Sequence, residues 1–108
     1  MTTEIVTIEH GKHRLRLVPG LGGGIASWDW QSANGWTPLL RAWDEVSEDR
    51  YTLAGFPLTP WSNRITGGGF EHDGVFHPVS ANRIGKPFSI HGDGWLQRWH
   101  VAGHLQRL

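Results

Sequence analysis

The chain opens with a regular alternation of hydrophobic and polar side chains. Arg14 and Arg16 alternate with leucines, a period of two that is typical of a strand with one buried face. Two segments of this kind lie on either side of the dipeptide Gly11-Lys12; they span residues 3–10 and 13–19. Two alternating segments joined by a short turn predict a half-buried β-hairpin.

Further extended segments follow, separated by turns. Glycines at positions 20 and 22–24 predict a bend that leads into a strand around residues 25–30. The Asn34-Gly35 pair predicts a turn, after which residues 37–43 resume an extended conformation. The polar stretch 44–50 is compatible with one helical turn or with a loop. The prolines of "FPLTPW", at positions 57 and 60, exclude a helix and a central strand.

The second half of the chain contains another strong hairpin signal. Asp73-Gly74 lies between "GGFEH" and "VFHPV", and this dipeptide is typical of a two-residue turn. Residues 80–94 are predicted to form a loop. In the last run, 95–108, tryptophans and histidines recur at helical spacing, but Val101 and Gly103 favour an extended segment.

These elements predict an all-β, antiparallel chain of six or seven strands, organised as a single domain over residues 1–108. The chain stops inside or just after a predicted strand, which leaves an open sheet edge. We therefore expect it to be part of a larger fold.

Composition narrows the class of protein. Ten basic and ten acidic residues cancel, so we expect no nucleic-acid partner and no membrane-surface partner. The absence of cysteine excludes disulfides and thiolate metal sites. The sequence contains no signal peptide and no apolar stretch of about 20 residues, which predicts a soluble, cytoplasmic protein. Seven tryptophans and fifteen glycines indicate a β protein with an aromatic core or an aromatic-lined cleft.

Seven histidines raise the question of a metal site. The sequence has no H-E-x-x-H motif and no carboxylate at a familiar ligand spacing, so we expect no metal. His72 and His77 lie on either side of the predicted Asp73-Gly74 turn, where they can pair with each other. His91 precedes a Gly-Asp-Gly loop and can either line a cleft with Trp95 or bond to a loop carbonyl.

Asn63 and Arg64 follow the proline-stiffened segment and precede a run of glycines at 67–69. The guanidinium group of arginine is a rigid fork of donors that suits vicinal sugar hydroxyls. Alternatively, Arg64 braces its own loop by bonding to carbonyl groups.

Several of these motifs together resemble the N-terminal part of the aldose 1-epimerases, or galactose mutarotases. The matching residues are Asn63-Arg64-Ile65, Gly68 and Phe70, Asp73-Gly74, Asn82, and His91-Gly92. The "HGDGW" ending with Trp99 is most similar to the bacterial mutarotase-related branch of the family.

The resemblance implies the N-terminal strands of an antiparallel β-sandwich of the galactose-mutarotase type. It implies interconversion of the α and β anomers of an aldose by acid/base ring opening, without a metal or organic cofactor. It assigns sugar binding to Asn63 and Arg64, and both sugar binding and catalysis to His91. The family's glutamate base and second histidine would lie beyond residue 108, so we expect the chain alone to be weak or inactive. Glu71 and Asp93 are the nearby carboxylates.

Two other classes of protein remain open. One is a non-catalytic carbohydrate-binding β module that uses Trp61 or Trp95 as a stacking platform beside Arg64 and His91. The other is a structural protein that self-associates through an exposed sheet.

Overall fold

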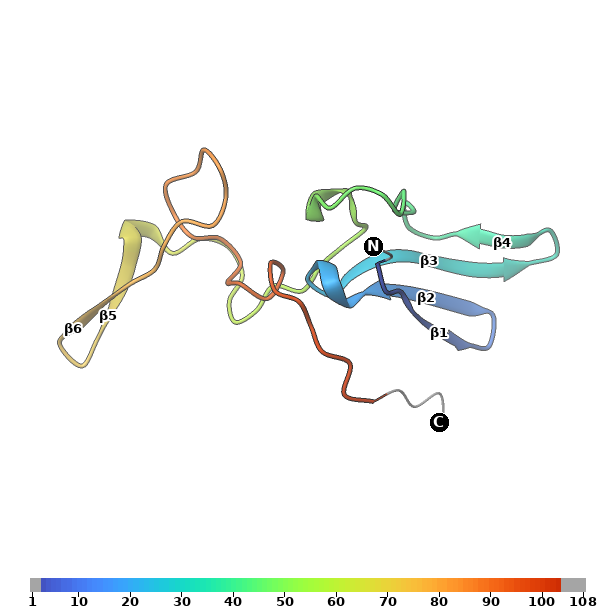
Figure 1. Cartoon of the computed structure of the whole chain (residues 1–108), viewed down its shortest axis with the longest axis horizontal. Helices are drawn as coiled ribbons and strands as arrows, with labels where there is room; N and C mark the ends of the chain where they lie inside the picture. Colours follow the sequence, from blue (N-terminus) through green and yellow to red (C-terminus); the bar gives the residue numbers. More distant parts are fainter. Residues whose placement is uncertain (1–2, 104–108) are drawn as a thin grey trace. The chain divides into compact units, whose positions relative to one another are not determined.

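The structure is a computed structural model that describes residues 3–103. The chain separates into two compact units: unit 1 comprises Met1–Pro57 and Trp95–Leu108, and unit 2 comprises Leu58–Gly94. Residues 3–103 contain antiparallel strands and short 3-10 turns but no α-helix (Figure 1). The predicted all-β, antiparallel class is therefore confirmed. A single domain over residues 1–108 stays a prediction.

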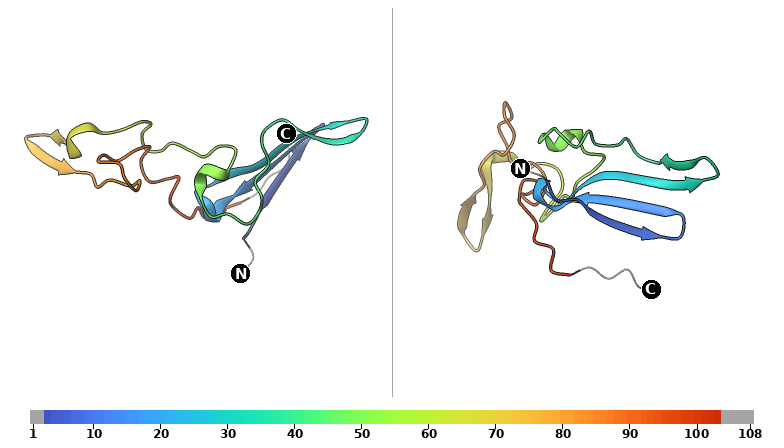
Figure 2. Two further views of the ribbon diagram at one scale, coloured as in Figure 1. Left: turned by 90° about the horizontal axis from the view of Figure 1, so that it is seen from above. Right: turned by 45° about the vertical axis from the view of Figure 1, so that its right-hand side comes forward.

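Unit 1 contains a four-stranded antiparallel sheet in the order β1-β2-β3-β4 (Figures 1 and 2). Its strands are β1 (Val6–His10), β2 (His13–Val18), β3 (Gly24–Ser32) and β4 (Gly35–Pro38). His10 pairs with His13, so the predicted Gly11-Lys12 turn is confirmed. The second turn comprises Ala33 and Asn34, one residue earlier than predicted, because Gly35 already pairs with Ser32.

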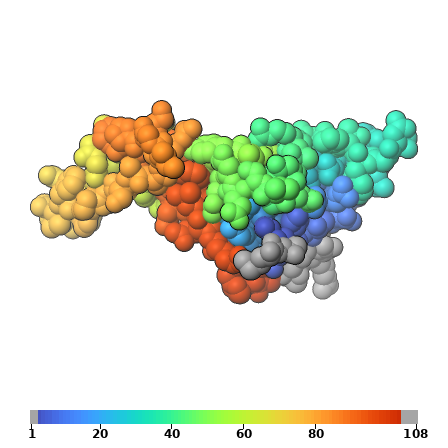
Figure 3. Space-filling view, turned by 45° about the horizontal axis from the view of Figure 1, so that its top comes forward, coloured from blue at the N-terminus to red at the C-terminus, as the bar shows by residue number. Residues whose placement is uncertain are grey.

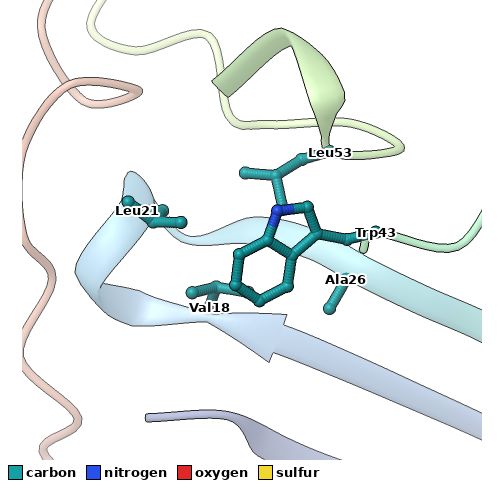
Figure 4. Packing of buried hydrophobic residues seen from close by; sticks show 5 residues of the cluster. All are labelled: Val18, Leu21, Ala26, Trp43 and Leu53. Carbon is teal, nitrogen blue, oxygen red and sulfur yellow. The ribbon is translucent and has the colours of Figure 1, made fainter. Parts of the chain in front are cut away.

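One face of this sheet carries the core of unit 1. Five side chains form it: Val18, Leu21, Ala26, Trp43 and Leu53 (Figure 4). The indole of Trp43 lies among the other four and is 6 % exposed. Its Nε1–H donates to the Ser47 carbonyl at 2.9 Å, so its polar atom is satisfied. Loss of a buried side chain of this size costs about 3–5 kcal/mol, which makes Trp43 the main contributor to this core.

The segment 39–57 covers this face. Leu39 and Trp43 donate their backbone N–H groups to β3, and β3 in turn donates from Ile25 to the Gly55 carbonyl, each at 2.8 Å. In the space-filling view the green atoms of this segment lie against the cyan and blue strands (Figure 3). The segment includes the 3-10 turn η2 (Arg50–Thr52), preceded by a loop over the predicted polar stretch.

The opposite face of the sheet, which we call the open face, is also apolar. Strand register places these residues on it: Val6, Ile8, Leu15, Leu17, Ile25, Trp28 and Trp30. None of the seven is buried, and Trp28 and Trp30 are among the exposed large hydrophobic residues. A hollow of about 480 Å³ lies on this face between His13, Leu15 and Trp28. The sheet thus has two apolar faces, only one of which is covered by the segment 39–57.

Residues 95–103 adopt no helix and no strand, so the predicted extended strand is not formed there; residues 104–108 of that prediction lie outside the described residues. Trp95 instead packs with Tyr51 and Phe56, with ring centroids 5.4–5.6 Å apart, and is 3 % exposed. These contacts hold Trp95 inside unit 1. The suggestion that Trp95 is a stacking platform for a ligand is therefore wrong.

Unit 2 is built on the second predicted hairpin. The 3-10 turn η3 (Thr66–Gly68) leads into β5 (Gly69–His72), which pairs with β6 (Val75–Pro78). Asp73 and Gly74 form the turn, as predicted. Phe70 and His77 stack across the hairpin at 5.4 Å. The "FPLTPW" segment forms neither helix nor strand, and its Thr59-Pro60 peptide is cis. No helix within residues 3–103 is long and apolar enough to cross a membrane.

Candidate functional site

Asn63 and His91 are joined in unit 2 by two reciprocal hydrogen bonds. The backbone N–H of His91 donates to the Asn63 carbonyl at 2.8 Å, and the backbone N–H of Asn63 donates to His91 Nδ1 at 2.9 Å. Both residues have positive φ, 63° and 61° respectively, which is uncommon outside glycine. Because Nδ1 accepts a hydrogen bond, the proton of the neutral imidazole lies on Nε2. The N–H donor of the His91 ring is therefore Nε2, on the side of the ring opposite the bond to Asn63.

An antiparallel bridge between Arg64 and Ile90 holds this pair together. The Ile65 N–H donates to the Ser89 carbonyl at 3.1 Å on the other side of the bridge. Ser89 and Ile90 are buried, at 3 % and 6 % exposure, so this short pairing is anchored in the interior of the chain. Two loops that are distant in the sequence are thus fixed in register.

The guanidinium group of Arg64 extends from this rigid frame. The residue is exposed, and its guanidinium makes no hydrogen bond and no ion pair within the part of the chain that the structure describes. The backbone N–H of Arg64 donates to Asn63 Oδ1 at 2.9 Å. The idea that Arg64 braces its own loop through carbonyl bonds is therefore wrong for the described residues. The side-chain oxygen of Asn63 is engaged in this local bond.

Gly92 lies at the contact between the proline-rich segment and the loop that carries His91. Its φ is +63°, and a Cβ at this position would lie 2.3 Å from the Thr59 carbonyl oxygen and 2.5 Å from Pro60 Cδ. Gly94 also donates its N–H to the Thr59 carbonyl at 3.0 Å. The segment before Asn63 therefore packs directly on the loop that carries His91, and only glycine fits at the contact.

The other predicted candidates have different surroundings. Glu71 lies in β5 opposite Phe76, and Asp93 is exposed in the turn after Gly92. His72 and His77 face each other across the hairpin with ring centroids 6.4 Å apart, as the sequence suggested. Within residues 3–103 no three His, Asp or Glu side chains lie close enough to hold a metal ion.

The fold and the site together define an antiparallel β protein in which one backbone bridge carries an arginine, without a side-chain partner among residues 3–103, and an oriented imidazole. The family model for aldose 1-epimerase matches residues 4–107. The chain therefore belongs to the aldose 1-epimerase family, as its motifs indicated.

Individual relatives agree with this assignment. The chain is 33 % identical over 100 residues to YphB of Escherichia coli K12, a match that covers 93 % of this chain and 32 % of YphB. A solved structure of a candidate aldose 1-epimerase from Escherichia coli K12 superposes with a TM-score of 0.82 at 32 % identity, covering 96 % of this chain and 34 % of the other.

A more distant structure shows the same fold. It is the GalM/aldose epimerase homologue from C. elegans, with a TM-score of 0.68 and 19 % identity over 97 % of this chain and 34 % of that chain. The chain thus spans about a third of the length of the relatives that it matches.

Proposed function

We propose that this chain supplies the sugar-binding side of a protein that interconverts the α and β anomers of an aldose by acid/base ring opening. In this proposal Asn63 and Arg64 bind the substrate, and His91 both binds it and takes part in catalysis. Membership of the aldose 1-epimerase family supports the class of reaction. The arrangement of the three residues on one rigid bridge supports the site.

The observation that carries the proposal is that the guanidinium of Arg64 has no hydrogen-bond or ion-pair partner among residues 3–103. An arginine side chain with no partner among the described residues adds no hydrogen bond to the stability of this bridge. Charged donors stabilise a fold when they are paired. A ligand with adjacent oxygens would complete its hydrogen bonding. Vicinal hydroxyls of a sugar fit the spacing of the guanidinium donors without requiring a negative charge.

His91 would act at the reacting centre. Its Nε2–H can donate to a sugar oxygen and thereby stabilise negative charge that develops during ring opening. The proton on Nε2 follows from the Nδ1 bond to Asn63, so the two residues work as a pair. Neither role needs a metal or an organic cofactor, in line with the expectation from the resemblance.

A complete reaction also needs a base for the anomeric hydroxyl. The two carboxylates closest in sequence to the site, Glu71 and Asp93, lie on the β5–β6 hairpin and in an exposed turn. No pattern in the chain assigns either of them the role of the base. We therefore propose that this chain by itself is weak or inactive as an epimerase. A carbohydrate-binding module without catalysis is the alternative, and it would use Arg64 and His91 with Trp61 as the stacking platform.

Polarimetry of freshly dissolved α-galactose and α-glucose tests the proposal. The wild-type chain is compared with His91→Ala and with His72→Ala, a histidine on the exposed hairpin. Acceleration that is lost in His91→Ala and retained in His72→Ala supports catalysis. Sugar binding by NMR without acceleration is the result expected both for an epimerase piece that is inactive alone and for the binding module. A folded chain that neither binds nor accelerates either sugar contradicts both.

A further inference from the structure

Asn82 makes three hydrogen bonds to the loop that carries His91. Its Nδ2 donates to the carbonyls of Ile90 and Gly92, and its Oδ1 accepts from the Ile90 N–H, each at 2.8 Å. The amide orientation is fixed by these partners, because a flipped amide would place its oxygen against two carbonyl oxygens. All the bonding capacity of the amide nitrogen is used in this contact.

These bonds occupy the one side of Ile90 that the bridge leaves unpaired. In the Arg64–Ile90 pair, the ladder bonds are made by the neighbours on either side, Ile65 to Ser89 and His91 to Asn63. The N–H and carbonyl of Ile90 itself therefore point away from Arg64. Asn82 binds both of them and so takes the place of a third strand.

His91 lies between Ile90 and Gly92, the two residues whose carbonyls accept hydrogen bonds from Asn82. Asn82 binds the peptide that joins Ile90 to His91 through the Ile90 carbonyl, and the peptide that joins Gly92 to Asp93 through the Gly92 carbonyl, so the backbone is held on either side of the His91–Gly92 pair. His91 and Gly92 both have positive φ, a conformation that a histidine does not keep without support. With the backbone fixed in this way, Nδ1 of the imidazole accepts a hydrogen bond from the Asn63 N–H.

We propose that Asn82 is a positioning residue for His91: it fixes the backbone conformation that directs Nδ1 to Asn63 and leaves Nε2–H as the donor. Asn82 does not touch the substrate in this proposal. The effect of Asn82 on sugar chemistry rests on the proposed function, but its control over the His91 ring does not.

The test measures the His91–Asn63 hydrogen bond directly in the 108-residue chain. An N–H···N bond gives a scalar coupling between the two nitrogens, here the Asn63 backbone N and His91 Nδ1, which NMR detects in a ¹⁵N-labelled sample. The wild type is expected to show this coupling with the His91 proton on Nε2. Asn82→Ala is expected to lose the coupling and to exchange the Asn63 amide proton about tenfold faster or more. A wild-type spectrum with the proton on Nδ1 overturns the proposal without any variant.

Two further variants make the outcome specific. Asn82→Asp keeps the size and the acceptor but presents an oxygen to both carbonyls, so it is expected to lose the coupling as well. Ile84→Ala, a fully exposed position in the same loop, is expected to keep it. Retention of the coupling in Asn82→Asp or Asn82→Ala overturns the proposal. Protection of the β5–β6 amides from exchange shows in each variant that the unit is folded. Should Asn82→Ala unfold the unit, the isosteric Asn82→Asp decides.

The same samples separate this inference from the proposed function. Galactose and glucose titrations are followed in the same spectra. If the coupling depends on Asn82 but no variant and no wild type responds to sugar, the positioning role stands and the proposed function fails.

Discussion

The backbone N–H of Asn63 donates to Nδ1 of His91 over 2.9 Å, although the two residues lie 28 positions apart in the sequence. This bond makes the imidazole part of the backbone frame that carries Arg64. A change in either loop is therefore expected to alter the positions of both the Arg64 guanidinium and the His91 imidazole.

Arg64→Ala is expected to weaken binding of an aldose to the chain. Loss of hydrogen bonds from a charged donor costs about 1.5–3 kcal/mol, which corresponds to roughly a 10- to 150-fold increase in Kd. Arg64→Lys keeps the charge but loses the planar fork, so it should restore only part of the affinity. NMR titration with galactose and glucose measures both. Lys86→Ala removes a positive charge from an exposed loop of the same unit and serves as the control. Equal affinity for wild type and Arg64→Ala would contradict the site.

Gly92→Ala is expected to destabilise unit 2 by more than the same change at Gly85. Both glycines have positive φ, +63° and +79°, and left-handed backbone costs an alanine about 1–2 kcal/mol. A Cβ at Gly85 meets nothing within 4 Å, whereas at Gly92 it would overlap the Thr59 carbonyl. We expect the overlap to add about 2 kcal/mol. Amide exchange of Ile65, whose N–H bonds across the bridge, reports the difference; a matching cost for the two variants would disprove the contact.

The two hairpins could be predicted because their information is local. Alternation around Arg14 and the turn dipeptides Gly11-Lys12 and Asp73-Gly74 determine strand type and register within about ten residues. The terminal run could not be predicted in the same way. Trp95 is held by Tyr51 and Phe56, which lie some forty positions earlier, and these contacts override the local preference for an extended strand.

The residues of the candidate site were identifiable from motifs, but their geometry was not. Asn63, Arg64 and His91 stand out by residue type and by their neighbours. The positive φ of Asn63 and the bond to Nδ1 depend on the bridge to Ile90, which joins two irregular loops. Asn82 appeared in the sequence only as one matching position of a family motif. Its role became visible through its three bonds.

Asp44 is expected to make the loop after Trp43 sensitive to acid. Its Oδ1 accepts from the backbone N–H groups of Ser47 and Val46, each at 2.9 Å, and these bonds lower the pKa of the carboxyl below 3.8. The charged form is therefore favoured by the fold. The stabilisation is complete above the unfolded-state pKa and is lost as the pH falls through the lower pKa of the folded state.

The measurement is amide exchange of Ser47 together with Trp43 fluorescence, followed from pH 6 downward. The indole of Trp43 bonds to the Ser47 carbonyl, so it reports opening of the same loop. Asp44→Asn keeps an acceptor without a titrating group and should remove the acid transition in this loop. Glu48→Gln, a nearby exposed carboxylate, is the charge-matched control and should leave the transition in place. An unchanged transition in Asp44→Asn would refute this assignment.

The open face is expected to cause self-association of the chain. Ile8, Leu15 and Trp28 are cross-strand neighbours at its centre, and exposed apolar patches of this kind favour association in water. Leu15→Lys places a charge in the middle of the patch and should shift the chain towards monomer, since burying an unpaired ammonium group is costly. Gln31→Lys adds the same charge at an exposed position of β3 outside the open face. Sedimentation velocity over a range of concentrations measures the fraction of monomer for the wild type and for both variants. Association through the open face is ruled out if the wild type stays monomeric throughout, or if the two variants shift the chain towards monomer equally.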